Sequence, residues 1–210
     1  IITYSPDTPV PTEKEVGKIL AEEKYGKGNV PKLSEEDCAK MAASETDNMV
    51  GLLIQALKDN GLYDNTVIVA YADHYLYTLD DKSILDKYKE TSNNLINHTP
   101  FFIWSSDLGQ LTSISKVNMQ MDILPTVLNL FGIYYNSNNY IGHDILSNDF
   151  KGYAFFSDYS WYDGKVYVEN QQITNGKKMS KNKLDSMNNL ISDVITKNDL
   201  TLKYDYFKSK

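Results

Sequence analysis

The feature that most constrains the fold is an unbroken apolar run, "VIVAYA" at residues 67–72, which ends at the polar pair Asp73 and His74. β-Branched and aromatic residues without polar interruption are typical of a strand that is covered on both faces in a parallel sheet. A second run, "TPFFIWS" at residues 99–105, has the same character. The two runs therefore predict buried strands of an α/β domain.

Helix signals flank these runs. Residues 34–60 open with Ser34 as an N-cap, continue with acidic residues in the first turn and stop at Gly61. The stretch "DILPTVLNLFG" at residues 122–132 predicts a shorter helix capped by Asp122, with Pro125 tolerated in its first turn. A short β-prone run, "IITYS", precedes both helices. This order of elements predicts an α/β fold with a mostly parallel sheet flanked by helices.

The pattern changes from about residue 152. The stretch "GYAFFSDYSWYDGKVYVENQQI" holds short strand runs around "YDGK", a hairpin signal, and so predicts antiparallel β-structure. A final helix is indicated by apolar residues on one face: Leu184, Met187, Leu190, Ile191, Val194 and Ile195. We predict a main body over residues 1–150, with an antiparallel hairpin and terminal helix of the same domain over residues 151–210.

Composition excludes several classes of protein. A net charge of -7, a pI near 5.0 and the lack of a basic patch argue against nucleic acid as a partner. Cys38 is the single cysteine, so no disulfide forms within the chain. No apolar run approaches the roughly 20 residues of a membrane span, and no signal peptide is present. We expect a soluble piece of a longer protein, because the chain begins without Met.

The polar pair after the first strand points to chemistry. Ligands of open α/β sheets bind beyond the carboxyl ends of the strands, where we expect Asp73 and His74. A carboxylate beside an imidazole suits Mn, Zn or Fe, and Mg through the carboxylate. Tyr75 is placed either to touch a substrate or to pack beside the strand. His98 is expected at the other end of its strand, away from this crevice, and His143 in a loop.

Four stretches in order resemble a known family: "GLYDNTVIVAYADHY", "HTPFFIW", "MDILPTVLNLFGI" and "YIGHDILS". They resemble the C-terminal half of the sulfatase-like branch of the alkaline phosphatase superfamily, and within it the lipoteichoic acid synthase and phosphoglycerol transferase proteins of Gram-positive bacteria. The resemblance covers nearly the whole chain. It implies an alkaline-phosphatase-like sheet on the outer face of the cell membrane, anchored by N-terminal transmembrane helices that this chain lacks.

The same resemblance implies a function. Asp73 and His74 would be two ligands of one catalytic divalent metal, Mn²⁺ or Mg²⁺, with Zn²⁺ and Ca²⁺ as further options. A metal-activated Thr would attack the phosphodiester of phosphatidylglycerol, diacylglycerol would leave, and glycerol phosphate would pass to a growing polymer or glycolipid. Chemistry on another phosphate or sulfate ester is the alternative that the same scaffold leaves open. The family holds this Thr in its N-terminal half, so no residue of this chain is assigned as the nucleophile, and the chain alone is expected to be inactive.

Two positions depart from the family pattern. Asp7 stands where the family has a substrate-binding His, and Leu76 stands where it has Gly. These departures favour an alternative, a degenerate domain that binds an envelope glycan or polymer without catalysis. A third hypothesis is a structural interaction domain in which the Asp-His pair is incidental. Trp161 and its neighbouring tyrosines suggest either a sugar-binding platform or cross-strand packing, and packing is the commoner role.

Overall fold

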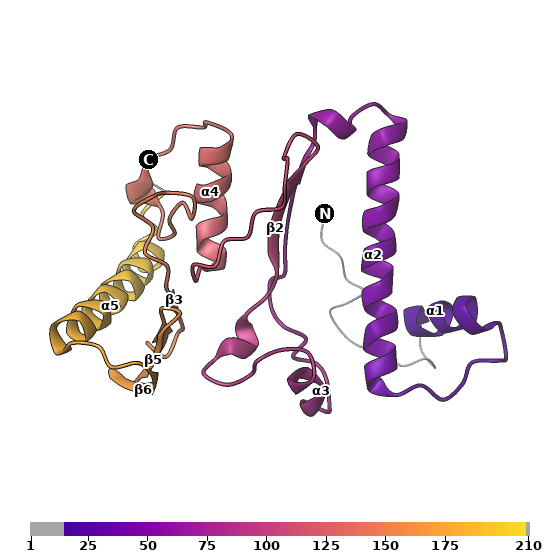
Figure 1. The fold of residues 1–210 in the computed structure, drawn as a ribbon, viewed down its shortest axis with the longest axis horizontal. Coiled ribbons are helices and arrows are strands. Elements are labelled where there is room, and N and C mark those ends of the chain that lie inside the picture. Colours follow the sequence, from indigo (N-terminus) through magenta and orange to yellow (C-terminus); the bar gives the residue numbers. More distant parts are fainter. Residues whose placement is uncertain (1–14, 209–210) are drawn as a thin grey trace. The chain divides into compact units, whose positions relative to one another are not determined.

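The computed structural model describes residues 15–208, and its contacts divide the chain between Leu111 and Thr112 into two compact units (Figure 1). The expected strand "IITYS" and the candidate substrate residue Asp7 lie outside the described residues.

The first unit holds two long helices. Helix α2, Glu35–Asp59, confirms the predicted helix, and Ser34 caps it. The Ser34 hydroxyl accepts from the Asp37 N–H at 3.1 Å, and the Asp37 carboxylate accepts from the Ser34 N–H at 3.2 Å. This reciprocal pair satisfies donors at the helix start. Helix α1, Glu15–Tyr25, carried no clear sequence signal, and it forms because Leu20 and Ala21 bury against Met41 of α2.

Strands β1, Val67–Tyr71, and β2, Phe101–Ser105, pair in the antiparallel sense, from Val67 opposite Ser105 to Tyr71 opposite Phe101. The expected strands and the α/β class are confirmed, but these two strands pair with each other in the antiparallel sense and not in the parallel sense that their unbroken apolar pattern indicated. The intervening residues, 72–100, include only the one-turn helix α3, Ser83–Asp86, and a 3-10 turn. Parallel neighbouring strands need a crossover connection that carries the chain back to the other end of the sheet. Here the loop connects the end of β1 to the start of β2 at the same end of the pair, so the two strands run antiparallel.

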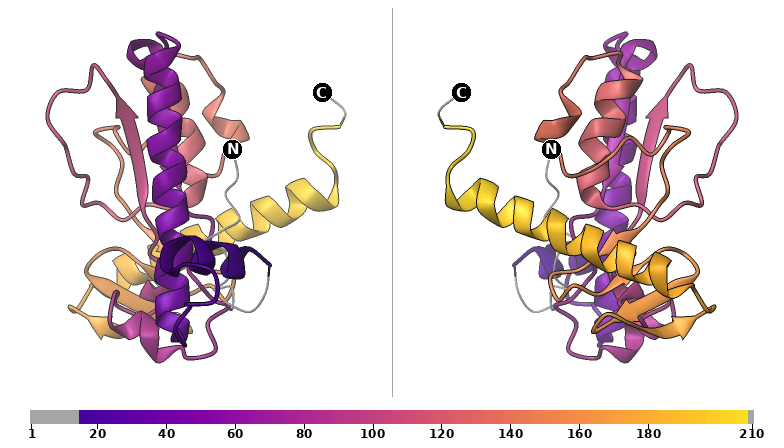
Figure 2. Two further views of the ribbon diagram at one scale, coloured as in Figure 1. Left: turned by 90° about the vertical axis from the view of Figure 1, so that its right-hand side faces the viewer. Right: turned by 90° about the vertical axis from the view of Figure 1, so that its left-hand side faces the viewer.

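The second unit confirms the antiparallel prediction. Strands β3, Ala154–Phe155, β4, Trp161–Tyr162, β5, Val166–Glu169, and β6, Gln172–Gly176, form one antiparallel sheet in chain order. Helix α5, Lys181–Lys203, packs its orange, N-terminal half on these strands (Figure 2). Four residues of the predicted apolar face enter this core, and they are Leu184, Met187, Ile191 and Ile195.

Trp161 is fully buried in this core, and its Nε1–H donates to Asn188 Oδ1 of α5 at 2.8 Å. A ring without solvent exposure cannot stack on a sugar. The structure therefore assigns Trp161 to packing, the commoner of the two roles suggested by the sequence.

Helix α4, Ile123–Leu130, follows directly on the 3-10 turn Gln120–Asp122. Asp122 stands at the predicted N-cap position, but its carboxylate makes no capping bond to α4, so that expectation is wrong. The chain at Asp122 is already helical (φ -81°, ψ -15°), whereas an N-cap residue is extended. Its buried carboxylate instead accepts from the N–H groups of Met119, at 2.8 Å, and His143, at 2.7 Å.

Candidate functional site

The candidate site is the pair Asp73 and His74, which follows β1 after a single residue, Ala72. The Asp73 side chain is 79% exposed and that of His74 is 33% exposed. Asp73 Oδ1 accepts from the backbone N–H of His74 at 3.0 Å and lies 3.6 Å from His74 Nε2. The two side chains therefore present an oxygen and a nitrogen to the same small volume at the end of the strand.

The backbone fixes the orientation of the His74 ring. Nδ1 lies 2.8 Å from the carbonyl oxygen of Tyr75. A carbonyl oxygen only accepts hydrogen bonds, so Nδ1 carries the hydrogen and the lone pair of the neutral ring is on Nε2, the nitrogen nearer to Asp73. Metal-binding histidines commonly have this arrangement, in which the other ring nitrogen donates to a backbone carbonyl.

The pair fits a divalent metal as part of a ligand set. A separation of 3.6 Å allows both atoms to contact one ion, because bonds from Zn²⁺ to nitrogen or oxygen are about 2.0–2.2 Å long. Zn²⁺ needs about four ligands, and Mg²⁺ about six. Within residues 15–208, no group of three or more His, Cys, Asp or Glu side chains could hold an ion. The described part of the chain thus supplies at most two protein ligands of this kind.

Tyr75 and Leu76, the next two residues, turn towards the protein interior. Both pack against a small core formed by Leu79, Ile84 and Leu85. The Tyr75 ring also lies edge-on to Tyr77, with centroids 6.4 Å apart. Tyr75 therefore has a packing role, and its contact with a substrate stays a prediction. Leu76 adds apolar area to this core that the glycine of the family pattern lacks.

The other two histidines are placed differently. Because β1 and β2 are antiparallel, the start of β2 lies beside the end of β1, and Thr99 Oγ1 donates to the Ala72 carbonyl at 3.4 Å. The expectation that His98 lies at the opposite end from Asp73 is therefore wrong. His98 still joins no metal-binding group with the pair in the described region. His143 lies in a loop of the second unit, as expected, and its N–H donates to Asp122.

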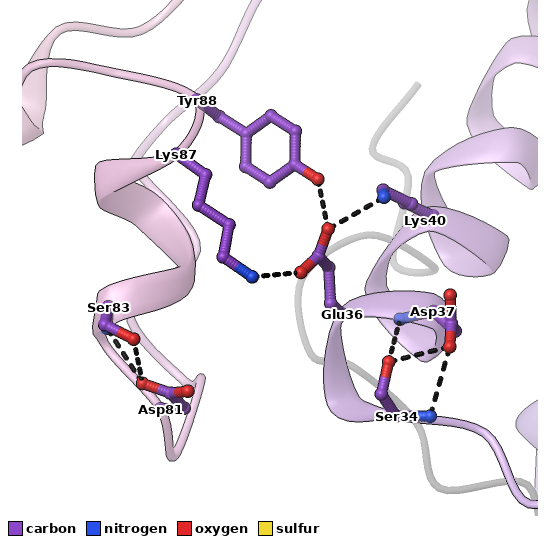
Figure 3. Close-up of polar contacts among 8 residues, drawn as sticks. All are labelled: Ser34, Glu36, Asp37, Lys40, Asp81, Ser83, Lys87 and Tyr88. Atoms are coloured by element: carbon purple, nitrogen blue, oxygen red, sulfur yellow. Dashed lines mark hydrogen bonds and ion pairs between the residues drawn. The ribbon is translucent and has the colours of Figure 1, made fainter.

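Two acidic residues that the sequence marked only as a helix start contact the segment after the pair. Glu35 accepts from the N–H groups of Asp80 and Asp81. Glu36 accepts from Lys40, Lys87 and Tyr88, and these bonds lower its pKa to about 2 (Figure 3). The Lys40 contact is local, four positions along α2, but no local signal could have found the others, because they join residues 45 to 52 positions apart.

Comparison with known proteins identifies relatives for most of the chain. Residues 3–133 match the sulfatase family model. A lipoteichoic acid synthase of Staphylococcus saprophyticus is 31% identical over 178 residues, which are 76% of this chain and 27% of that protein. One from Staphylococcus aureus is 33% identical over 138 residues, which are 58% of this chain and 21% of that protein. The chain thus spans about a quarter of the length of these curated relatives.

A solved structure shows the same fold. The lipoteichoic acid synthase LtaP from Listeria monocytogenes matches with a TM-score of 0.70 at 23% identity, over 86% of this chain and 50% of that one. The expected alkaline-phosphatase-like fold is confirmed. Among the helices of residues 15–208, none combines the length and the apolar character that crossing a bilayer requires.

Proposed function

The chain belongs to the sulfatase family, and from that membership we propose that it is part of a metal-dependent phosphoglycerol transferase related to lipoteichoic acid synthase. The observation that carries the proposal is the geometry of Asp73 and His74. An oxygen and an imidazole nitrogen lie 3.6 Å apart at the end of a strand, and a backbone carbonyl holds the ring.

Asp73 and His74 would supply two ligands to a divalent ion, Mn²⁺ or Mg²⁺, with Zn²⁺ and Ca²⁺ as further options. Such an ion, when bound, stabilises negative charge on phosphoryl oxygens and lowers the pKa of a hydroxyl nucleophile. The carboxylate of Asp73 contributes the negative charge that favours a cation. The Tyr75 carbonyl keeps the hydrogen of the His74 ring on Nδ1, so that Nε2 can bind.

The proposed substrate is an ester of the phosphatidylglycerol type, or another phosphate or sulfate ester. We place the domain on the extracellular face of the cell membrane. The remaining metal ligands and the nucleophile, a Thr in the family pattern, are proposed to lie outside residues 15–208. Asp7, which stands where the family has a substrate-binding His, is proposed to contact the substrate or its counter-ion.

A second function is favoured by one observation. Leu76 replaces the family glycine and packs into the core of the first unit, so the loop after the pair differs in its side-chain packing from the family pattern. A degenerate domain that binds an envelope glycan or polymer without catalysis would tolerate such a change. The two functions differ in what they require of His74, because only the transferase needs its Nε2.

Calorimetry with Mn²⁺ tests the metal site. The 210-residue chain should bind Mn²⁺ weakly, since few ligands are present, and both His74→Ala and Asp73→Asn should abolish the binding. His98→Ala is the matched control, because it removes a nearby histidine from the same end of the strand pair. Tight Mn²⁺ binding that persists in His74→Ala would show that the pair is not the site.

Activity is measured on the complete gene product with vesicles of phosphatidylglycerol. The wild type should release diacylglycerol in the presence of Mn²⁺, His74→Ala should release none, and His98→Ala should behave as the wild type does. Wild-type protein that binds an envelope polymer but releases no diacylglycerol would support the degenerate binding domain instead.

A further inference from the structure

We infer that the first turn of α2, through Glu35 and Glu36, positions the Asp73–His74 pair by anchoring the segment that follows it. This segment, residues 75–97, is called the anchored segment below. Its structural role is independent of the proposed function, whereas its effect on metal affinity rests on that function.

Glu35 makes the first anchor. Its Oε1 accepts from the N–H of Asp80 at 2.6 Å, and its Oε2 accepts from the N–H of Asp81 at 3.0 Å. Both oxygens of one carboxylate thus bind consecutive amides of the anchored segment. Hydrogen bonds to an ionised acceptor are roughly twice as strong as neutral ones, and a two-point contact also fixes direction.

Glu36 makes the second anchor, on the residues that directly follow α3 in the same segment (Figure 3). Its Oε2 accepts from Lys87 Nζ at 2.6 Å, and its Oε1 accepts from the Tyr88 hydroxyl. Lys40 of α2 also donates to Oε1 at 2.8 Å. The two anchors together hold the segment on both sides of the short helix α3.

An apolar layer lies with these polar contacts. Leu79, Ile84 and Leu85 of the anchored segment are almost fully buried, and Ala39 of α2 packs against them. Tyr75 and Leu76 join the same layer, and they are the two residues that follow His74 directly. The apolar layer that Ala39 of α2 contacts therefore includes the two residues next to the pair.

The link to the imidazole is the Tyr75 carbonyl. It accepts from His74 Nδ1 at 2.8 Å and from the backbone N–H of Tyr77, also at 2.8 Å. The Tyr77 carbonyl in turn accepts from Lys82 Nζ, within the same segment. The orientation of the His74 ring therefore depends on the conformation of residues 75–77, and Tyr75 and Leu76 are held by the same apolar layer that Ala39 of α2 contacts.

The three acids of this helix turn have separate roles. Asp37 bonds locally to Ser34 and caps the helix. Glu35 and Glu36 reach instead to residues 45 to 52 positions away. Acidic side chains in the first turn of a helix generally interact favourably with the helix dipole, and this interaction requires no distant partner. The long-range contacts distinguish an anchor from a helix signal.

The test compares Glu35→Gln and Glu35→Ala with Glu45→Gln, a control with the same loss of charge further along α2. Hydrogen exchange of the Asp80 and Asp81 amides reports the anchor. The ¹⁵N spectrum of the His74 ring reports its tautomer and order, and Mn²⁺ titration reports affinity. A glutamine retains one acceptor oxygen, so Glu35→Gln should weaken protection less than Glu35→Ala does.

If the inference holds, Glu35→Ala removes the protection of both amides, broadens or shifts the Nδ1–H signal of His74 and weakens Mn²⁺ binding about tenfold, the lower end for residues that support a metal ligand. Glu45→Gln should change none of these. Loss of amide protection with an unchanged His74 signal would overturn the positioning role. A wild-type protein that binds no Mn²⁺ would contradict the proposed function but not the positioning role. The ¹⁵N spectrum of the His74 ring tests that role without any metal.

Discussion

The carboxylate of Asp122 accepts a hydrogen bond from the backbone N–H of His143 across 2.7 Å. This bond joins two of the stretches that carry the family resemblance, "MDILPTVLNLFGI" and "YIGHDILS". Thr126 adds a second link, since its Oγ1 accepts from the Ile145 N–H at 3.1 Å and donates to the Asp122 carbonyl at 2.6 Å. These hydrogen bonds therefore hold the loop that contains His143 and Ile145 against the start of α4.

Replacing Asp122 with asparagine should destabilise the protein by about 1–3 kcal/mol. Each carboxylate oxygen accepts one backbone N–H, from Met119 and from His143, and an amide can replace only one of them. Urea unfolding measures the change. Asp149→Asn, at an exposed site in the same unit, should stay within about 0.5 kcal/mol of the wild type. Equal stability of Asp122→Asn and the wild type would contradict this role.

Gly142 is required by close packing. A Cβ built on it would lie 1.8 Å from the carbonyl oxygen of Met121, so Gly142→Ala must displace the backbone at the start of α4. We expect a loss of about 3 kcal/mol, the upper end of the range typical of overpacked sites. Gly109→Ala is the control, because a Cβ there meets nothing within 4 Å. Comparable melting temperatures for the two variants would disprove the close approach.

We expect Glu36 to make the free energy of unfolding depend on pH in the acid range. Hydrogen bonds from Lys40, Lys87 and Tyr88 lower its pKa from 4.5 to about 2 in the folded protein. A lowered carboxyl pKa stabilises the fold above the unfolded value, and this contribution is lost as the pH falls from 4.5 to about 2. Denaturant unfolding at several pH values should show a shallower acid decline for Glu36→Gln. Parallel curves for the two proteins would exclude this contribution.

Trp161→Phe tests packing against sugar binding. The smaller ring leaves a cavity and removes the donor to Asn188, so we expect a loss of about 2 kcal/mol. Trp104→Phe, at a half-buried position in β2, should cost less. Urea unfolding gives both values. A Trp161→Phe protein of wild-type stability that had lost glycan binding would revive the platform interpretation.

Local patterns predicted much of the fold. Ser34 with its acidic first turn indicated α2, the runs around residues 67–72 and 99–105 indicated β1 and β2, and "YDGK" indicated the turn between β4 and β5. Each of these elements is selected by residues within a few positions of one another. Helix α1 gave no such signal, because its short apolar face becomes stable only when it packs on α2.

The sequence by itself determined that Asp73 and His74 stand together at the end of a strand, since they are neighbours in the chain and the apolar run before them ends there. Only the tertiary structure decided what surrounds them. The direction of β2 brought His98 to the same end, and Glu35 and Glu36 reached the anchored segment across a long stretch of chain. Strand direction and such distant contacts depend on the path of the whole chain, which leaves no periodic pattern in the residues nearby.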